Sequence, residues 1–173
     1  MPAQARFRPL RCAVLTLSDT RTPETDTSGD TLAERLQAEG HHLQDRALLP
    51  DDLYRLRAQI SVWIADPRVE VILTTGGTGL TGRDRTPEAV RPLLDRHIDG
   101  FGELFRQISF QEIGVSTLES RAFAGVANAT VIFCLPGSRN ACQTAWDHII
   151  RQQLDARHQP CNLVALLPRF NEA

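Results

Sequence analysis

Short apolar runs recur along the chain, and glycine, proline or acidic residues bound most of them. Continuous runs such as residues 11–17 and 69–75 are typical of strands that a parallel sheet buries on both faces. The run at 42–49 is mixed in polarity and is expected nearer a sheet edge. Strands are predicted at residues 11–17, 42–49, 69–75, 122–127 and 130–135, with a hairpin turn at Asn128-Ala129 joining the last two.

Helical periodicity separates these runs. Leu56, Ile60 and Trp63 recur at helical spacing and indicate an amphipathic helix that Asp66-Pro67 ends. An earlier helix is expected to begin at a cap on Thr27 or Ser28 and to end at Gly40. Further helices are predicted from Pro87, where Pro92 is expected to bend or shorten the helix, over 98–113, and over 140–156.

The segment 98–113 is more apolar than a solvent-facing helix, because it carries three phenylalanines on a helical pattern. Three interpretations stay open from the sequence. The segment forms a subunit interface, covers the site as a lid, or packs against the body of the domain.

Strands that alternate with helices predict an α/β fold with a mainly parallel sheet and helices on both faces. In such sheets, ligands bind outside the carboxyl ends of the strands. This rule brings four segments to one edge, since each follows a predicted strand. They are Ser18-Asp19, Pro50-Asp51, the glycine-rich residues after Thr75, and 136–138.

The chain has 173 residues and a formal net charge of −2, which fits one domain at 11–173 behind an N-terminal arm at 1–10. This charge gives no reason to expect nucleic acid or an anionic membrane as a partner. No apolar run is long enough for a membrane span, and the N-terminal run is too short for a signal peptide, so a cytoplasmic protein is expected. Cys12 and Cys134 lie in strand-like runs and are interpreted as structural thiols.

A glycine-rich loop follows the strand at 69–75 and leads into a helix at Thr86-Pro87. Gly76, Gly77 and Gly79 leave room for a phosphate or a planar ring to approach the backbone. The spacing matches neither a Walker motif nor a dinucleotide fingerprint. From the loop alone, a structural turn and an anion site are equally favoured.

Asp51 and Asp84 favour the anion site, because carboxylates beside a phosphate are explained by a bridging Mg²⁺. Purely structural roles compete with this interpretation: Asp51 caps the helix that begins there, or Asp84 pairs with Arg83 or Arg85. No side chain stands out as a covalent nucleophile, so a substrate that brings its own nucleophile fits better.

Six motifs occur in order and resemble the molybdopterin adenylyltransferase / molybdenum cofactor biosynthesis protein B family. They are Leu-Ser-Asp at 17–19, Asp-Thr-Ser-Gly at 26–29, Thr-Thr-Gly-Gly-Thr-Gly at 74–79, Arg-Asp-x-Thr-Pro at 83–87, Asp-Gly-Phe-Gly at 99–102 and Pro-Gly-Ser at 136–138. The resemblance runs from about residue 11 to about residue 163. Residues 141–146 and 153–157 look most like the protein B branch.

The resemblance implies a three-layer α/β/α sandwich that assembles as a homo-oligomer, a trimer or hexamer. It implies a pocket for molybdopterin and ATP, with other molybdenum cofactor biosynthesis proteins as further partners. Active members transfer AMP from Mg-ATP to the terminal phosphate of molybdopterin. The nucleophile is then the substrate's own phosphate, so the protein mainly positions reactants and neutralises charge.

By motif, Asp51 and Asp84 would be the acidic pair essential for the reaction, acting through Mg²⁺. The pocket implied by the same motifs comprises Gly76, Gly77, Thr78 and Gly79 for nucleotide and phosphate, Pro136, Gly137 and Ser138 for the nucleotide, Ser116 and Ser120 for the pterin, and Asp19, Asp26, Ser28 and Gly29 nearby.

An active enzyme is the favoured interpretation, because the chain keeps Pro50-Asp51 and Arg83-Asp84 as the active enzymes of the family do, whereas some protein B members replace the acidic positions. Two alternatives remain. One is a catalytically silent molybdopterin-binding or assembly module, and the other is a nucleotide-binding domain unrelated to pterin.

Overall fold

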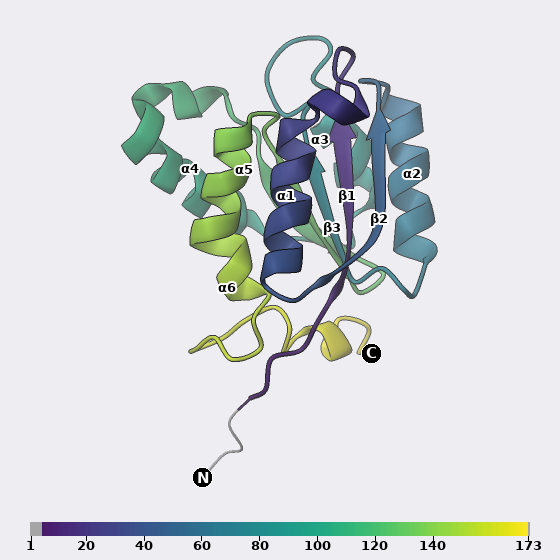
Figure 1. The fold of residues 1–173 in the computed structure, drawn as a ribbon, viewed down its shortest axis with the longest axis vertical. Helices are drawn as coiled ribbons and strands as arrows, with labels where there is room; N and C mark the ends of the chain where they lie inside the picture. Colours follow the sequence, from purple (N-terminus) through teal and green to yellow (C-terminus); the bar gives the residue numbers. More distant parts are fainter. Residues whose placement is uncertain (1–4, 173) are drawn as a thin grey trace.

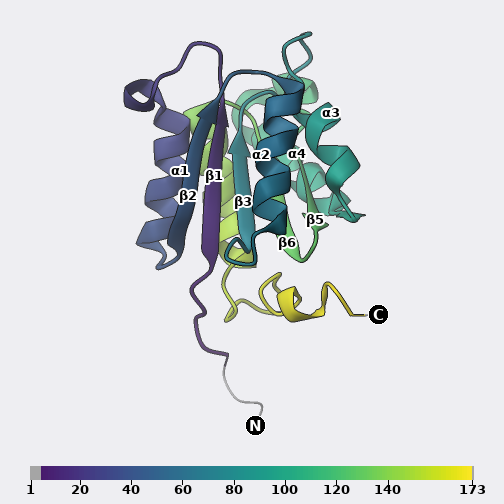
Figure 2. The same cartoon turned by 90° about the vertical axis from the view of Figure 1, so that its right-hand side faces the viewer.

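The structure is a computed structural model that describes residues 5–172. A six-stranded sheet in the order β2-β1-β3-β6-β5-β4 lies between two layers of helices (Figures 1 and 2). The strands are β1 (Arg11–Leu17), β2 (His42–Leu49), β3 (Val71–Thr75), β4 (Arg96–His97), β5 (Phe123–Ala127) and β6 (Thr130–Leu135). The helices are α1 (Thr27–Ala38), α2 (Leu53–Ala65), α3 (Thr86–Val90), α4 (Asp99–Ile113), α5 (Arg139–Ala145) and α6 (Arg151–Gln153).

The four strands β2, β1, β3 and β6 are parallel, so their carboxyl ends point to the top of Figure 1. All of β3 and β6 and nearly all of β1 are buried, as continuous apolar runs predict for strands covered on both faces. The mixed strand β2 lies at the edge, as its sequence predicted. The fold class is therefore the predicted three-layer α/β/α sandwich.

Alternate side chains of β1 enter two separate cores, because successive residues of a strand face opposite sides of the sheet. Val14 packs with Leu32 and Leu36 of α1 and with the helix that follows β6. Leu15 packs instead with residues of α2 that include Trp63. Figure 2 shows the sheet between α1 on one side and α2 on the other.

The segment predicted at 98–113 forms α4, and its two halves differ. Phe101 and Phe105 are buried in the core, and the Phe101 ring meets the Phe133 ring edge-on at a centroid distance of 5.2 Å. Phe110 is 51% exposed. Packing against the body of the domain therefore explains the first half of α4, whereas the second half presents apolar surface to solvent.

Several element boundaries differ from the sequence prediction. Asp26, not Thr27 or Ser28, caps α1, because its carboxylate accepts from the Gly29 N–H at 3.0 Å. Helix α3 ends early and continues as a 3₁₀ turn across Pro92, as expected. The two-residue strand β4 and the 3₁₀ helix Gly114–Glu119 were not predicted.

The long helix after β6 ends at Gln153 instead of residue 156, and a π-helical turn (Trp146–Ile150) joins α5 to α6. The hairpin turn between β5 and β6 falls at Asn128 and Ala129, as predicted, and both have positive φ. The predicted arm at 1–10 begins outside the described residues, and the domain at 11–173 ends outside them.

Cys12 and Cys134 are fully buried in β1 and β6, as expected for structural thiols. Burial raises the pKa of Cys134 to about 12, so its thiol stays protonated and inert at neutral pH. Among residues 5–172, every helix is too short or too polar to cross a bilayer.

We expect Phe101→Ala to lower the free energy of unfolding by about 3–5 kcal/mol, since it opens a cavity among buried aromatic rings. Phe110→Ala, on the exposed half of the same helix, should change it by less than about 0.5 kcal/mol. Urea denaturation of both variants measures the difference. A loss below about 1 kcal/mol at Phe101 would contradict the core assignment.

Candidate functional site

A cavity of about 680 Å³ opens at the carboxyl ends of the parallel strands. Its wall combines the segments after β1, β2, β3 and β6 with residues of α4 and of the 3₁₀ helix Gly114–Glu119. The strand-end rule therefore located one side of this cavity correctly. The opposite side comes from α4 and the turn after it, which no strand end marks.

The glycine-rich loop is held in a conformation that a side chain would prevent. Gly76 and Gly77 have φ values of 106° and 68°, in the left-handed region that favours glycine. A Cβ atom on Gly76 would lie 2.3 Å from the Leu17 carbonyl oxygen. Thr86 secures the loop from the other end, because its Oγ1 donates to the Gly76 carbonyl at 2.9 Å and its N–H donates to the Gly77 carbonyl at 3.0 Å.

Two carboxylates approach this glycine backbone closely. A Cβ atom on Gly77 would lie 3.4 Å from Asp51 Oδ1, and one on Gly79 would lie 2.8 Å from Asp84 Oδ2. The absent side chain of Gly79 thus makes room for Asp84, whereas the absent side chain of Gly77 makes room chiefly for Thr86 Oγ1, with Asp51 just beyond. Asp84 Oδ2 also accepts from the N–H and the hydroxyl of Thr81, at 2.9 and 2.7 Å.

Asp19 links the ends of three strands. Its carboxylate accepts from the backbone N–H of Asp51 at 3.0 Å and from the guanidinium of Arg83 at 2.6 Å. These two interactions hold the pKa of Asp19 below its usual range. Arg83 therefore pairs with Asp19, and not with Asp84 as one interpretation of the sequence proposed.

Asp51 is half-buried, and its burial raises the pKa of its carboxyl; the charge of Asp19 adds to this and that of Asp84 contributes less. Its neighbour Asp52 caps α2, because Asp52 Oδ1 accepts from the Arg55 N–H at 2.8 Å. The helix cap and the site acid are thus two different residues. Asp51 carries a charge that the fold disfavours and that no cap explains.

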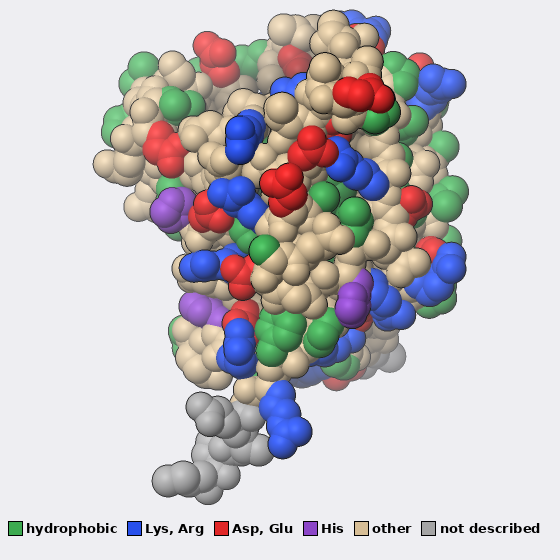
Figure 3. Space-filling view, viewed as in Figure 1, with side chains coloured by type: hydrophobic (Ala, Val, Ile, Leu, Met, Phe, Trp, Pro, Cys, Tyr) green, Lys and Arg blue, Asp and Glu red, His purple; other side chains and the backbone are tan. Residues whose placement is uncertain are grey.

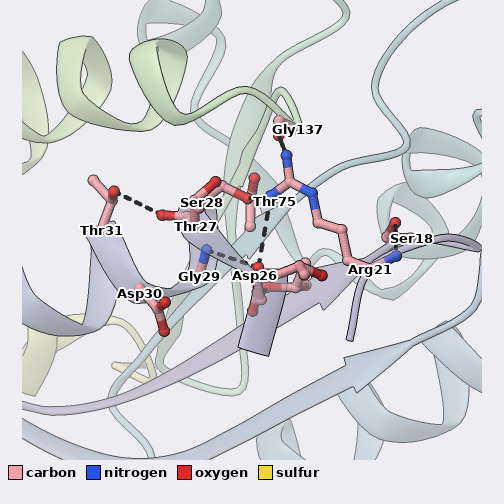
Figure 4. A network of polar contacts seen from close by, with 12 residues as sticks. Ser18, Arg21, Asp26, Thr27, Ser28, Gly29, Asp30, Thr31, Thr75 and Gly137 are labelled. Atoms are coloured by element: carbon pink, nitrogen blue, oxygen red, sulfur yellow. Dashed lines mark hydrogen bonds and ion pairs between the residues drawn. The ribbon is translucent and has the colours of Figure 1, made fainter. Parts of the chain in front are cut away.

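Arg21 is the one cationic side chain among the cavity-lining residues of the described chain. Its guanidinium donates to the Gly137 carbonyl at 3.0 Å and to the Ser28 hydroxyl, and Figure 4 shows it reaching across from the segment after β1. The acids Asp19, Asp51, Asp84, Glu112 and Glu119 line the same cavity. An anionic substrate therefore needs a further cation in this site.

Most of the predicted site residues lie in the cavity wall. These are Asp19, Ser28, Asp51, Gly76, Gly77, Thr78, Gly79, Asp84, Ser116, Ser120, Pro136, Gly137 and Ser138. Ser138 also caps α5, since its hydroxyl accepts from the Ala141 N–H at 3.1 Å.

Asp26 and Gly29 do not line the cavity, but Figure 4 shows them close to Ser28 and Arg21, which do. The buried Asp26 carboxylate accepts from Thr16 Oγ1 on β1 and from Arg46 on β2, both at 2.8 Å. Burial alone would raise the pKa of Asp26, but the hydrogen bonds from Arg46, Thr16 and Gly29 lower it below its ordinary value. Asp26 thus joins α1 to two strands.

Sequence reasoning missed several wall residues, of which Arg21, Glu112 and Glu119 carry charge. Arg21 follows Asp19 by two positions, so the strand-end rule could have found it. Glu112 is on α4, and its carboxylate accepts from Thr144 Oγ1 at 2.9 Å and from Asn140 Nδ2 at 3.1 Å. No local pattern places α4 beside the helix after β6, so Glu112 had no sequence signal.

The described part of the chain, residues 5–172, holds no cluster of three or more His, Cys, Asp or Glu side chains that could bind a metal ion alone. A pair of carboxylates with phosphate oxygens and water is the ligand set that Mg²⁺ usually takes. Asp51 and Asp84 fit this pattern, because both approach the glycine backbone where a phosphate would lie.

Figure 3 shows acidic and basic side chains mixed over the face it presents, with no extended basic patch there.

Comparison with known proteins gives consistent matches. Residues 13–156 match the family model described as "Probable molybdopterin binding domain". The chain is 57% identical to molybdenum cofactor biosynthesis protein B of Escherichia coli (strain K12), over 90% of this chain and 92% of that protein. It is 45% identical to the protein of the same name from Staphylococcus carnosus, over 86% and 88%. A crystal structure of molybdenum cofactor biosynthesis protein B aligns with a TM-score of 0.82 at 44% identity, over 85% and 92%.

Because Asp52 caps α2 and Asp51 does not, substitutions at the two positions should have opposite effects on stability. At pH 7 without divalent cations, Asp51→Asn should raise the melting temperature, because the raised folded-state pKa of Asp51 means that its charge destabilises the fold above that pKa. This difference should disappear below the unfolded-state pKa. Asp52→Ala should cost about 1 kcal/mol, since α2 loses its cap. Thermal unfolding across pH checks both, and a melting temperature lowered by Asp51→Asn at pH 7 would refute the first.

Proposed function

The chain belongs to the molybdopterin-binding domain family, in its molybdenum cofactor biosynthesis protein B branch, and we propose that it acts in molybdenum cofactor biosynthesis as a molybdopterin adenylyltransferase. An oxygen of the terminal phosphate of molybdopterin attacks the α-phosphorus of ATP. The bond from that phosphorus to the β-phosphate breaks, and pyrophosphate leaves. AMP is thereby transferred to the pterin phosphate.

The observation that carries this proposal is the placement of Asp51 and Asp84 against the glycine backbone within one cavity. Carboxylates repel phosphate, so two of them beside a glycine-rich loop are explained by a cation that arrives with the nucleotide. When Mg-ATP is bound, Mg²⁺ supplies positive charge that neutralises the phosphate oxygens.

The loop backbone supplies hydrogen-bond donors for the same phosphates. Within residues 5–172, the N–H groups of Gly77, Thr78 and Gly79 donate to no other group of the protein. Such unpaired N–H groups in a glycine-rich turn favour the anion site over a purely structural turn. Arg21 adds one positive charge to the wall next to Gly137, which itself lies against Gly76.

Direct transfer fits the cavity better than a covalent enzyme intermediate. All 19 basic residues of the chain are arginines, so no lysine amine exists to carry AMP. Cys142, close behind the wall, is buried, and its burial raises the pKa of the thiol to about 11. The proposed roles of the protein are therefore to align two phosphate-bearing substrates and to hold the charge between them.

We further propose that the exposed apolar face next to the site contributes to the homo-oligomer that the family resemblance implies. This face comprises Phe110 and Ile113 at the end of α4 with Val115 and Leu118 on the turn after it. Apolar side chains gathered in this way are typical of subunit interfaces. The cytoplasmic location expected from the sequence stays a prediction.

If Asp51 and Asp84 hold the cation, Asp51→Asn and Asp84→Asn should each lower the rate of AMP transfer at least ~10²-fold, about 2.7 kcal/mol of transition-state stabilisation. Asp52→Asn is the matched control, because it removes an adjacent exposed charge and keeps a residue that can cap α2; its rate should stay within about threefold of the wild type. Release of pyrophosphate from ATP in the presence of molybdopterin measures the rate.

Three results would count against this function. Full activity in both Asp51→Asn and Asp84→Asn would show that the acids are not catalytic. Tight molybdopterin binding by the wild type without ATP turnover would favour a silent binding module. ATP binding with no affinity for molybdopterin would favour a nucleotide-binding domain of another kind.

A further inference from the structure

Arg121 lies between the 3₁₀ helix Gly114–Glu119 and β5, and its contacts converge on the glycine-rich loop. Its backbone N–H donates to the Thr78 carbonyl at 2.9 Å. Its side-chain Nε donates to the Gly79 carbonyl at 2.8 Å, and its Nη2 donates to the Asp84 carbonyl at 2.7 Å. One guanidinium therefore holds the first and the last residue of a six-residue segment, which we call the outer loop (residues 79–84).

A carboxylate sets the orientation of this guanidinium. Arg121 Nη1 forms an ion pair with Glu88 at the start of α3, and Glu88 does not line the cavity. One edge of the planar guanidinium thus pairs with the Glu88 carboxylate, and its other N–H donors bind carbonyls of the outer loop. The N–H donors of a guanidinium have a fixed planar arrangement, which the ammonium group of a lysine on its flexible side chain does not reproduce.

The outer loop has few other attachments. Its remaining contacts are internal, from the Asp84 N–H to the Thr81 carbonyl and from Thr81 to the Asp84 carboxylate, apart from the exposed ion pair between Arg83 and Asp19. Within residues 5–172, two residues outside the outer loop form hydrogen bonds with it: Asp19, through this ion pair, and Arg121. Exposed ion pairs contribute little to stability, so the position of the outer loop depends mainly on Arg121.

The same residue links two walls of the cavity. Ser120, which directly precedes Arg121, lies in the wall beside the 3₁₀ helix, and Gly79 and Asp84 lie in the wall formed by the glycine-rich loop. Arg121 itself does not line the cavity. It is suited to set the distance between the two walls without touching a substrate.

We propose that Arg121 is a positioning residue for Asp84 and for the adenylyl transfer, an inference that rests on the function proposed above. Arg121 donates hydrogen bonds to the carbonyls of Gly79 and Asp84 and thereby fixes the position of the Asp84 carboxylate relative to the cation. It also fixes the position of Ser120 relative to the part of the cavity wall that the glycine-rich loop forms. Groups that orient a ligating side chain typically change metal affinity or activity 10- to 100-fold when they are replaced.

The variants that test this inference are Arg121→Lys and Arg121→Gln, with Arg57→Lys and Arg57→Gln as matched controls. The Arg57 side chain also donates to two backbone carbonyls, that of Glu88 at 2.9 Å and that of Ala89 at 3.2 Å. Arg57 makes no hydrogen bond to the outer loop within the described residues. Both arginines therefore support α3, and only Arg121 reaches residues 79–84.

The first measurement is amide hydrogen exchange at Thr81 and Asp84, whose N–H groups are hydrogen-bonded within the outer loop, and it needs no substrate. Both Arg121 variants should exchange at least about tenfold faster there than the wild type, because the loop opens more often. The Arg57 variants should match the wild type at these two amides. Wild-type exchange in Arg121→Lys, or equally fast exchange in the Arg57 variants, would overturn the proposal.

The second measurement is AMP transfer as a function of Mg²⁺ concentration. For both Arg121 variants we expect kcat to fall by ~10- to 100-fold, with the Mg²⁺ concentration at half-maximal rate raised and KM for molybdopterin within about threefold of the wild type. The Arg57 variants should keep the wild-type Mg²⁺ dependence. An unchanged Mg²⁺ dependence in Arg121→Gln would also overturn the proposal.

The two measurements separate this inference from the function it rests on. A wild-type protein that transfers no AMP would refute the proposed function, and hydrogen exchange would still decide whether Arg121 holds the outer loop.

Discussion

The contact between the backbone of Gly76 and the carbonyl oxygen of Leu17 is the constraint on which the site depends. A Cβ atom at Gly76 would lie 2.3 Å from that oxygen, closer than any two such atoms approach. The loop therefore passes directly over the end of β1, and the Gly76 N–H reaches the Leu135 carbonyl at the end of β6 at 3.0 Å. Directly after β3, Gly76 thus contacts the ends of both strands that flank β3 in the sheet.

This convergence explains the unusual charge of the cavity. The loops that follow β1, β2 and β3 each bring an acid to the same edge: Asp19, Asp51 and Asp84. Arg83 neutralises Asp19, while Asp51 stays half-buried with a raised pKa. The fold thus keeps a charge in a place where it is unfavourable, a feature that clusters at functional sites. The proposed role of Mg-ATP accounts for this charge by supplying its counterion.

Helix α4 connects the core to the site and to the outer surface. Phe101 and Phe105 fasten its first half to the sheet, and Glu112 in its second half reaches the helix after β6 through Thr144. The apolar side chains at the end of α4 lie beside the cavity but face solvent. Assembly with another subunit through this face, as proposed, would also brace the wall that carries Ser116 and Ser120.

The sequence by itself determined the layers of the fold and one side of the site, because both follow from local patterns. Buried strands occur as continuous apolar runs, amphipathic helices as periodic ones, and the carboxyl ends of parallel strands necessarily share an edge. For this reason the order of strands and loops along the chain was enough to place Asp51, Asp84 and the glycines together. The cap on α1 was misassigned, since Asp26, Thr27 and Ser28 are all capable caps and only the backbone geometry distinguishes them.

The tertiary structure alone decided which side chains meet across long sequence separations. Arg83 pairs with Asp19 and not with the adjacent Asp84, Arg121 grips the outer loop, and Glu112 faces the helix after β6. Each partner follows from the relative placement of whole elements, and such placement leaves no periodic trace in the sequence. The motif at residues 74–88 was predicted as a candidate anion-binding loop, but the residue that holds its outer part in place became visible only in the folded chain.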